Sequence, residues 1–164
     1  MLLPSTTFQM LLAATTHFPH WYARLQAWQS QAYSNHLHLA IVREPYLSRL
    51  LASSKRVESR FARDRRPPFG RVQPGDILLL KRTGGPLAGL ALAEYALSRP
   101  LTDLNEVRMA YGDDLAITDP HFWQHYAHAR YLTLIWLDEI IPLPAIPLPR
   151  HHRSGWEIIE RWSG

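Results

Sequence analysis

A lysine, a glutamate and an arginine lie within a few residues of one another in segment 53–60, which reads SSKRVESR. In an extended chain, Glu58 and Arg60 lie on the same face and can form an ion pair. Lys55 falls at the expected junction of a helix and a strand, where its side chain can point into a cleft. A lysine in that place can accept a proton or stabilise a developing negative charge. The alternative is an ordinary salt bridge at the edge of a strand.

The loop that follows this segment is rich in arginine. Arg63, Arg65 and Arg66 come just before two prolines that stiffen the loop. The chain has a net charge of +4, and of its 18 lysines and arginines only Lys55 and Lys81 are lysines. Arginine suits bidentate phosphate contacts and stacking on bases, so this bias favours a nucleic-acid partner. A mildly basic surface without a role, or a GC-rich genome, would give the same composition.

Three histidines, His121, His125 and His128, recur at spacings that would place them on one face of a helix, as metal ligands require. No carboxylate lies at the positions that an H-E-x-x-H arrangement needs. The chain also has no cysteine, which excludes thiolate metal sites, disulfides and cysteine nucleophiles. We therefore expect no metal site and no cofactor.

Cations also lie beside an aromatic ring near the end of the sequence. His151, His152 and Arg153 come shortly before Trp156. An indole flanked by cations can stack on a base. Alternatively, Trp156 is buried in the core and the basic residues lie outside it.

The first 36 residues form a distinct leader. After Pro19, the aromatic and apolar residues Trp21, Leu25 and Trp28 recur at helical spacing. This pattern predicts a helix whose aromatic face packs on the rest of the protein.

From residue 37 onward the apolar pattern changes to short strands. The sequence at 73–76, QPGD, predicts a tight turn, with proline presetting φ and glycine supplying a positive φ. Asp119, followed by Pro120, is expected to cap a helix, and the prolines after residue 141 are expected to exclude both helix and central strand from the segment that follows. Strands in a meander with inserted helices indicate an α+β fold with a small closed or nearly closed barrel. The expected strands are 37–42, 55–61, 77–81, 87–97, 131–141 and 156–159, and the expected helical segments are 44–54 and 101–129.

Segment 53–60 resembles the G-x-K-x-x-E-x-R motif of the ASCH domain family, a branch of the PUA-like superfamily. Pro45-Tyr46, the VQPGD turn ending at Asp76 and Arg130-Tyr131 also match. The resemblance covers about residues 37–160. It implies a small PUA-like β-barrel with flanking helices at 37–164, preceded by an N-terminal helical extension at 1–36. The motif's first glycine is replaced by Ser53, at a position where glycine would ease a left-handed turn.

Members of this family are thought to bind RNA, and related PUA barrels bind it in a groove beside the equivalent helix. The resemblance therefore implies RNA or a modified nucleoside as the partner. The residues expected to bind it are Tyr46, Lys55, Arg60, Arg63, Arg65, Arg66 and Trp156.

A hydrolase is the alternative that the resemblance implies. Some bacterial members look like enzymes that remove the acetyl group from N4-acetylcytidine with the motif lysine, a threonine and a later acid, and ribonuclease activity has been attributed to others. Lys55 matches the lysine, Glu58 takes the place of the threonine, and the later acid falls near Asp113 or Asp114. A deep, closed pocket around Lys55 would favour a nucleoside enzyme, whereas an open groove along the arginine loop would favour a polymer.

The composition, 46% hydrophobic and 20% charged over 164 residues, is that of one globular domain. No segment approaches the roughly 20 apolar residues of a membrane helix. The apolar start lacks the positively charged lead of a signal peptide. We expect a soluble, cytoplasmic protein that makes no membrane contact, and the oligomeric state is left open.

Overall fold

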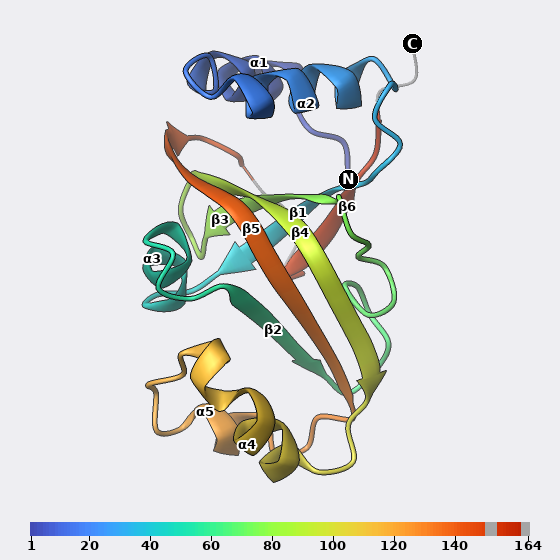
Figure 1. Ribbon diagram of the computed structural model, residues 1–164, viewed down its shortest axis with the longest axis vertical. Coiled ribbons are helices and arrows are strands. Elements are labelled where there is room, and N and C mark those ends of the chain that lie inside the picture. The colour runs from blue at the N-terminus through green and yellow to red at the C-terminus, as the bar shows by residue number, and fades with distance from the viewer. Residues whose placement is uncertain (150–153, 162–164) are drawn as a thin grey trace.

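Six strands form one mixed sheet that curls into a half-barrel (Figure 1). The structure is a computed structural model, and it describes residues 1–149 and 154–161. The order of strands in the sheet is β2-β5-β4-β3-β1-β6. β1 runs parallel to β3, and every other neighbouring pair is antiparallel. The strands are β1 (Leu37–Val42), β2 (Val57–Ala62), β3 (Ile77–Arg82), β4 (Leu87–Pro100), β5 (Tyr131–Ile146) and β6 (Trp156–Ile159).

Helices cover the two ends of this sheet, so the fold class is α+β, as predicted. The helices of the N-terminal leader lie at one end, and α4 and α5 lie at the other, beside β2 (Figure 1). The helices are α1 (Ser5–Ala14), α2 (Pro19–Gln29), α3 (Tyr46–Leu51), α4 (Leu104–Leu115) and α5 (Phe122–His125). Within the described parts of the chain, no helix is both long and apolar enough to cross a membrane.

The leader packs on the sheet through its aromatic face, which confirms that prediction. Trp21, Leu25 and Trp28 are buried, and they share one apolar cluster with β1 and β3 residues such as Leu37 and Leu79. Apolar area is thus removed from water on both sides of this contact.

β3 and the turn that precedes it also agree with the prediction from the sequence. Ile77 to Leu80 are fully buried in β3, as an uninterrupted apolar run in a covered strand requires. The Asp76 N–H donates to the Gln73 carbonyl (3.0 Å), and Gly75 has φ +92°, as the tight turn demands. These two features fix where β3 begins.

β5 is longer than predicted, because it continues through Pro142 to Ile146. β2 pairs with β5 only as far as Trp136, so the second half of β5 is paired on one side, by β4. A proline lacks the N–H of an interior strand residue but fits on an edge. The predicted end of this strand at residue 141 is therefore wrong, whereas the exclusion of a central strand from the proline segment agrees with this one-sided pairing.

The region between β4 and β5 contains less helix than predicted. Asp103 caps α4 by accepting from the Asn105 N–H (2.9 Å), and Asp119 accepts from the His121 N–H (2.9 Å) without being the N-cap of α5. α5 is one turn long, so the histidine stripe that ends at His128 does not lie along one helix face.

Candidate functional site

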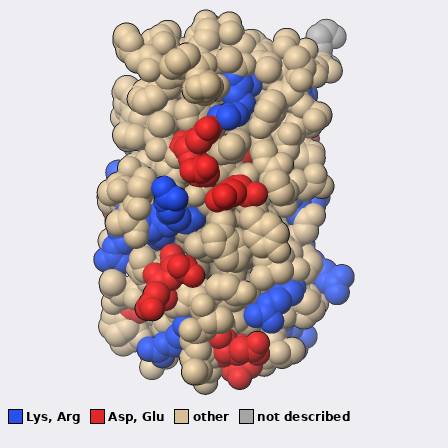
Figure 2. Space-filling view, viewed as in Figure 1, with Lys and Arg blue, Asp and Glu red and all other residues tan. Residues whose placement is uncertain are grey.

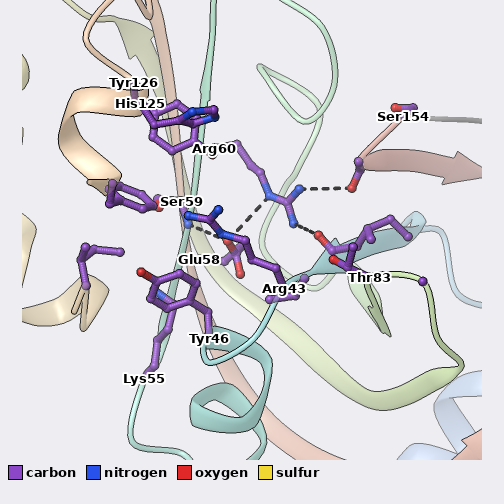
Figure 3. Close-up of a pocket in the computed structure, with 16 residues that line it drawn as sticks. Arg43, Tyr46, Lys55, Glu58, Ser59, Arg60, Thr83, His125, Tyr126 and Ser154 are labelled. Atoms are coloured by element: carbon purple, nitrogen blue, oxygen red, sulfur yellow. Dashed lines mark hydrogen bonds and ion pairs between the residues drawn. The ribbon is translucent and has the colours of Figure 1, made fainter. Parts of the chain in front are cut away.

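A cavity of about 710 Å³ lies at the open seam of the half-barrel, where β2 faces β1 and the residues before β6. Its walls come from β2, the ends of β1 and β3, the start of α3, α5 and its flanks, and Ser154-Gly155. Lys55, Glu58 and Arg60 all line this one cavity, together with Tyr46 (Figure 3).

Arg60 holds the seam together. Its guanidinium donates from Nη2 to the Ile41 carbonyl (2.8 Å) and from Nη1 to the Gly155 carbonyl (3.1 Å). It also lies over the Trp156 ring, 5.1 Å from the centroid. Arg60 therefore bridges the β2 edge to the opposite edge of the sheet, in addition to forming a cavity wall.

Glu58 is buried beside this arginine. Its Oε1 accepts from the Ser59 N–H (3.1 Å) and lies 3.7 Å from Arg60 Nε, which is the ion pair expected from strand alternation. Its Oε2 is buried and accepts no hydrogen bond from any described residue. Buried polar atoms of native proteins are usually hydrogen-bonded, so an unpaired one in a cavity wall is an open place for a ligand group.

Lys55 lies deeper than expected, because only 3% of the residue is exposed. Its Nζ donates to the Leu115 carbonyl at the end of α4 and lies 5.5 Å from the Tyr46 ring centroid. Burial lowers the pKa of Lys55, and the charge of Glu58 opposes that shift. The lysine thus lines the cavity with its ammonium group held against the end of α4.

Tyr46 offers its hydroxyl group to the cavity. The residue is 5% exposed, and the guanidiniums of Arg43 and Arg49 lie within 6 Å of its ring centroid. Its hydroxyl is buried and makes no hydrogen bond to the described residues. Little of the ring is left for stacking on a base, but the hydroxyl can donate to one or accept from one.

Several cavity residues escaped sequence reasoning. Tyr126 and His125 lie on the side of the cavity opposite Lys55 and Tyr46, and Arg43 reaches between them (Figure 3). Tyr126 is half-buried and stacks on Phe61, with ring centroids 5.0 Å apart. These side chains come from turns and short helices, and no spacing rule connects them to segment 53–60.

The cavity continues into neighbouring hollows. A hollow of about 490 Å³ shares Arg60 and Tyr126 with it and extends to Arg66, and another of about 350 Å³ shares His125 and Tyr126 with it and extends to Arg63. Tyr126 lines all three. The three depressions therefore adjoin one another around Tyr126, and we refer to them together as the groove, which extends from Lys55 to the arginine loop.

The arginines of the loop differ in their surroundings. Arg66 forms two contacts of 2.6 Å with Asp64, and these hydrogen bonds lower the pKa of Asp64 to about 2. Arg65 lies over the rings of Phe69 and Tyr131. Arg63 lines the hollow of about 350 Å³ and is exposed.

Other expected site residues lie apart from the cavity. Asp113 and Asp114 are exposed near the end of α4, and it is the backbone of Leu115 that meets Lys55. Trp156 is buried and does not line the cavity itself, but it lines the hollow of about 490 Å³, and its indole N–H donates to His38. Residues 151–153, expected beside this indole, lie outside the described residues.

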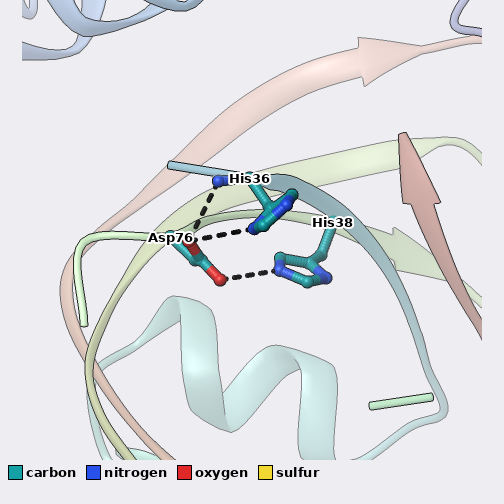
Figure 4. Close-up of side chains that lie close together, drawn as sticks. All are labelled: His36, His38 and Asp76. Carbon is teal, nitrogen blue, oxygen red and sulfur yellow. Dashed lines mark hydrogen bonds and ion pairs between the residues drawn. The ribbon is translucent and has the colours of Figure 1, made fainter. Parts of the chain in front are cut away.

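A second buried polar group contains His38 and Asp76, with His36 beside them (Figure 4). Asp76 Oδ2 lies 2.9 Å from His38 Nε2, and the Trp156 indole donates to His38 Nδ1 (3.1 Å). Because an indole can only donate, the His38 proton must be on Nε2, facing Asp76. Burial raises the pKa of Asp76, but hydrogen bonds from His38, Gln73, His36 and Asn35 outweigh it and lower the pKa overall.

Among the described residues, His36, His38 and Asp76 form the one group close enough together to hold a metal ion. The ring nitrogen of His38 that faces Asp76 carries a proton, and both Asp76 oxygens already accept N–H bonds. Metal ligation needs a free imidazole lone pair. The arrangement therefore serves hydrogen bonding, and it anchors the turn before β3.

The charged residues show no single basic field on the face seen in Figure 2. Lysine and arginine side chains are interspersed there with aspartate and glutamate. Arg43 with Asp119 (3.7 Å) and Arg24 with Glu139 (2.7 Å) are examples of such pairing. On this face, contacts to an anion must therefore come from local groups of unpaired arginines.

By sequence, the chain matches no protein-family model and no curated protein. By structure, it is similar to an ASCH protein of Zymomonas mobilis, with TM-score 0.55 and 17% identity over 68% of this chain and 73% of the other. A tyrosine-to-phenylalanine variant of that protein gives TM-score 0.55 at 18% identity, over 68% and 76% of the two chains. A serine-to-alanine variant gives 0.52 at 16%, over 67% and 74%. These likenesses show the fold.

Proposed function

Because the chain has the ASCH fold, a PUA-like half-barrel, we propose that it binds single-stranded RNA at the seam of the sheet. One base enters the cavity of Lys55, Glu58 and Tyr46, and the strand continues along the groove past Tyr126 toward the arginine loop. The observation that carries this proposal is the continuity of the cavity with the arginine-lined hollows. A polymer uses such a groove, whereas a free nucleoside would need the cavity alone.

The unpaired polar atoms support a base as the occupant of the cavity. Glu58 Oε2 can accept from an N–H donor on a base edge, and the Tyr46 hydroxyl can pair with a neighbouring ring or carbonyl atom. Hydrogen bonds to buried groups that are otherwise unpaired discriminate strongly between ligands. The preference for one base should therefore come from Glu58 and Tyr46, and the affinity for RNA in general should come from arginine.

Tyr126 provides the direct test. Tyr126→Leu keeps apolar packing against Phe61 but removes the aromatic face. Stacking on one base contributes about 1–3 kcal/mol, so RNA affinity should fall about 5- to 150-fold in fluorescence anisotropy. Tyr95→Leu, at a more exposed tyrosine away from the groove, is the matched control. Equal affinities of the two variants for short single-stranded RNAs would remove Tyr126 and the groove from the interface.

A hydrolase acting on a modified nucleoside or on RNA is the second candidate, because burial lowers the pKa of Lys55. A lysine with a lowered pKa has more of the neutral amine, which can accept a proton. Turnover of N4-acetylcytidine and of a short RNA by the wild type and by Lys55→Met tests this, with thermal melting as the control. Turnover by the wild type that the variant loses supports the hydrolase, and equal turnover by both clears Lys55 of a catalytic role.

A further inference from the structure

A small hollow at the far end of the groove is lined by basic side chains. It measures about 550 Å³, and its walls are Arg63, His128 and Arg130 with the two alanines that flank His128. No acidic residue lines it. It shares Arg63 and His128 with the hollow that leads to Tyr126 and the cavity.

The topology of the sheet brings the two arginines together. β2 and β5 are antiparallel, with Ala62 opposite Tyr131, so the next residues outward in this register are Arg63 and Arg130. The Arg130 N–H donates to the Ala62 carbonyl (2.8 Å), and the Arg130 carbonyl accepts from the Leu101 N–H (2.7 Å). The base of the hollow is therefore held by backbone hydrogen bonds, and its side chains project from a fixed frame.

Like charges opposite each other at a strand pair are unfavourable. Elsewhere in this protein arginines are matched with carboxylates, as in the pairs Arg66–Asp64 and Arg82–Glu44. Within the described ranges, Arg63, His128 and Arg130 form no ion pair with a carboxylate. The fold thus keeps two guanidiniums and an imidazole together without a compensating anion.

We infer that the hollow of Arg63, His128 and Arg130 is a phosphate-binding subsite. Two guanidiniums present forked N–H donors that match phosphate oxygens, and the imidazole adds another donor when it is protonated. Phosphate supplies the negative charge that offsets the repulsion between the arginines. The phosphate is part of the backbone of the RNA strand whose base occupies the Lys55 cavity. This inference therefore rests on the proposed function.

The subsite changes which arginines are expected to contact the RNA backbone. Arg66 is already paired with Asp64, and Arg65 covers the rings of Phe69 and Tyr131. Arg63 and Arg130 remain as the arginines available to a phosphate at this end of the groove. The affinity for RNA should therefore depend more on Arg130, which lies almost seventy residues from Arg63 in sequence, than on Arg65 or Arg66.

The experiment measures RNA affinity as a function of salt for the wild type and for Arg130→Gln, Arg63→Gln and Arg71→Gln. Arg71 is exposed in the same loop and lines none of these hollows, so its variant is the matched control for net charge. Arg130→Gln and Arg63→Gln should each reduce the logarithmic salt slope by about 0.7, the value for one phosphate on a single strand. Arg71→Gln should leave the slope unchanged. All three substitutions keep the backbone hydrogen bonds.

A second measurement separates this inference from the proposed function. Inorganic phosphate is titrated into wild-type protein and Arg130→Gln, and the side-chain Nε–H signals of the arginines are followed by NMR. Shifts at Arg63 and Arg130 in the wild type, together with loss of the Arg63 shift in the variant, support the subsite even when no RNA binds, a result that would sink only the proposed function. RNA binding that Arg130→Gln leaves unchanged, or that Arg71→Gln weakens equally, would overturn the subsite while the proposed function stands.

Discussion

Two buried polar groups lie on either side of Trp156, and they differ in how completely they are paired. In the first, Asp76, His38 and the indole of Trp156 form a chain in which each side chain's hydrogen-bonding atoms meet a partner. In the second, around the seam cavity, Glu58 Oε2, the Tyr46 hydroxyl and Arg60 Nε have no hydrogen-bond partner among the described residues. The first has no room for a ligand, and the second surrounds an open cavity.

This difference distinguishes buried polar groups that stabilise the fold from buried polar groups that are available to a ligand. Burying a polar atom costs free energy unless it is hydrogen-bonded, so a fully paired group contributes to stability and specifies the fold. A group that remains unpaired beside a cavity carries that cost until a ligand removes it. Substitutions in the Asp76 group should therefore affect folding, and those in the Glu58 group should affect binding.

The largest expected effect is on stability, from Asp76→Ala. The carboxylate accepts four N–H bonds, two of them from the backbone of His36 and Gln73. Removing it leaves buried donors unpaired, and the free energy of unfolding should fall by about 3–5 kcal/mol in urea denaturation. Asp113→Ala, at an exposed aspartate, should change it by less than about 0.5 kcal/mol. Similar losses in both variants would contradict the structural role of the Asp76 group.

The same carboxylate should give the wild type an acid-dependent stability. Hydrogen bonds lower the folded-state pKa of Asp76 below its ordinary value of 3.8. Its contribution is therefore complete above that value and is lost as the pH falls from 3.8 through the lowered folded pKa. Asp76→Ala should lack this part of the acid transition.

The next effect in size is on binding, from Glu58→Ala. Loss of a hydrogen bond to a charged group costs about 1.5–3 kcal/mol, so affinity for the preferred RNA should fall about ten- to hundredfold. Stability should change by less than about 1 kcal/mol, because the variant also removes a buried charge that is only partly paired. Glu94→Ala, at an exposed site on β4, is the control. A Glu58→Ala variant that loses stability but binds RNA normally would reverse the comparison.

Lys55→Met should change how stability depends on pH. Burial lowers the pKa of Lys55 from 10.5, so the folded protein releases this proton at lower pH than the unfolded chain does. Wild-type stability should rise with pH between the lowered folded pKa and 10.5, by at most about 1.4 kcal/mol per pH unit. The methionine variant should lack this rise. Parallel profiles in alkaline urea titrations would show that the ammonium is not desolvated.

The smallest effect should come from Ser53→Gly, which touches neither polar group. Ser53 has φ +57°, a conformation that costs a side-chain-bearing residue about 1 kcal/mol relative to glycine. The variant should therefore melt a few degrees higher, with unchanged RNA affinity. Ala116→Gly, at φ +51°, provides a matched second site. A lower melting temperature for Ser53→Gly alone would show that the serine side chain stabilises the junction.

Local rules predicted much of this fold. The left-handed turn at Ser53, the turn at Gly75 and the short final strand beginning at Trp156 all agree with the sequence. Each depends on residues close together in the chain. The predicted length of β5 was wrong, because the edge of a sheet tolerates proline and the sequence does not show where β2 stops pairing with β5.

The cavity was less accessible to sequence reasoning. Strand alternation brought Glu58 and Arg60 together, but the depth of Lys55 depends on α4 folding over it from sixty residues away. Tyr126 and Arg43 reach the site from turns whose paths are set by tertiary packing. The pairing of Arg63 with Arg130 follows from the β2–β5 register, which becomes known only with the sheet order.

The prolines in the second half of β5 also affect how one molecule meets another. Beyond Trp136 this strand has no strand neighbour on its β2 side among residues 1–149 and 154–161, and an unpaired edge is a template for strand addition and aggregation. The Glu139 carbonyl on this stretch is already occupied by the Trp21 indole (3.0 Å), and Pro142 and Pro144 have no N–H to offer. A strand from a second molecule would find a broken row of partners there. Pro142 and Pro144 thus interrupt the row of donors that strand addition at this edge would need.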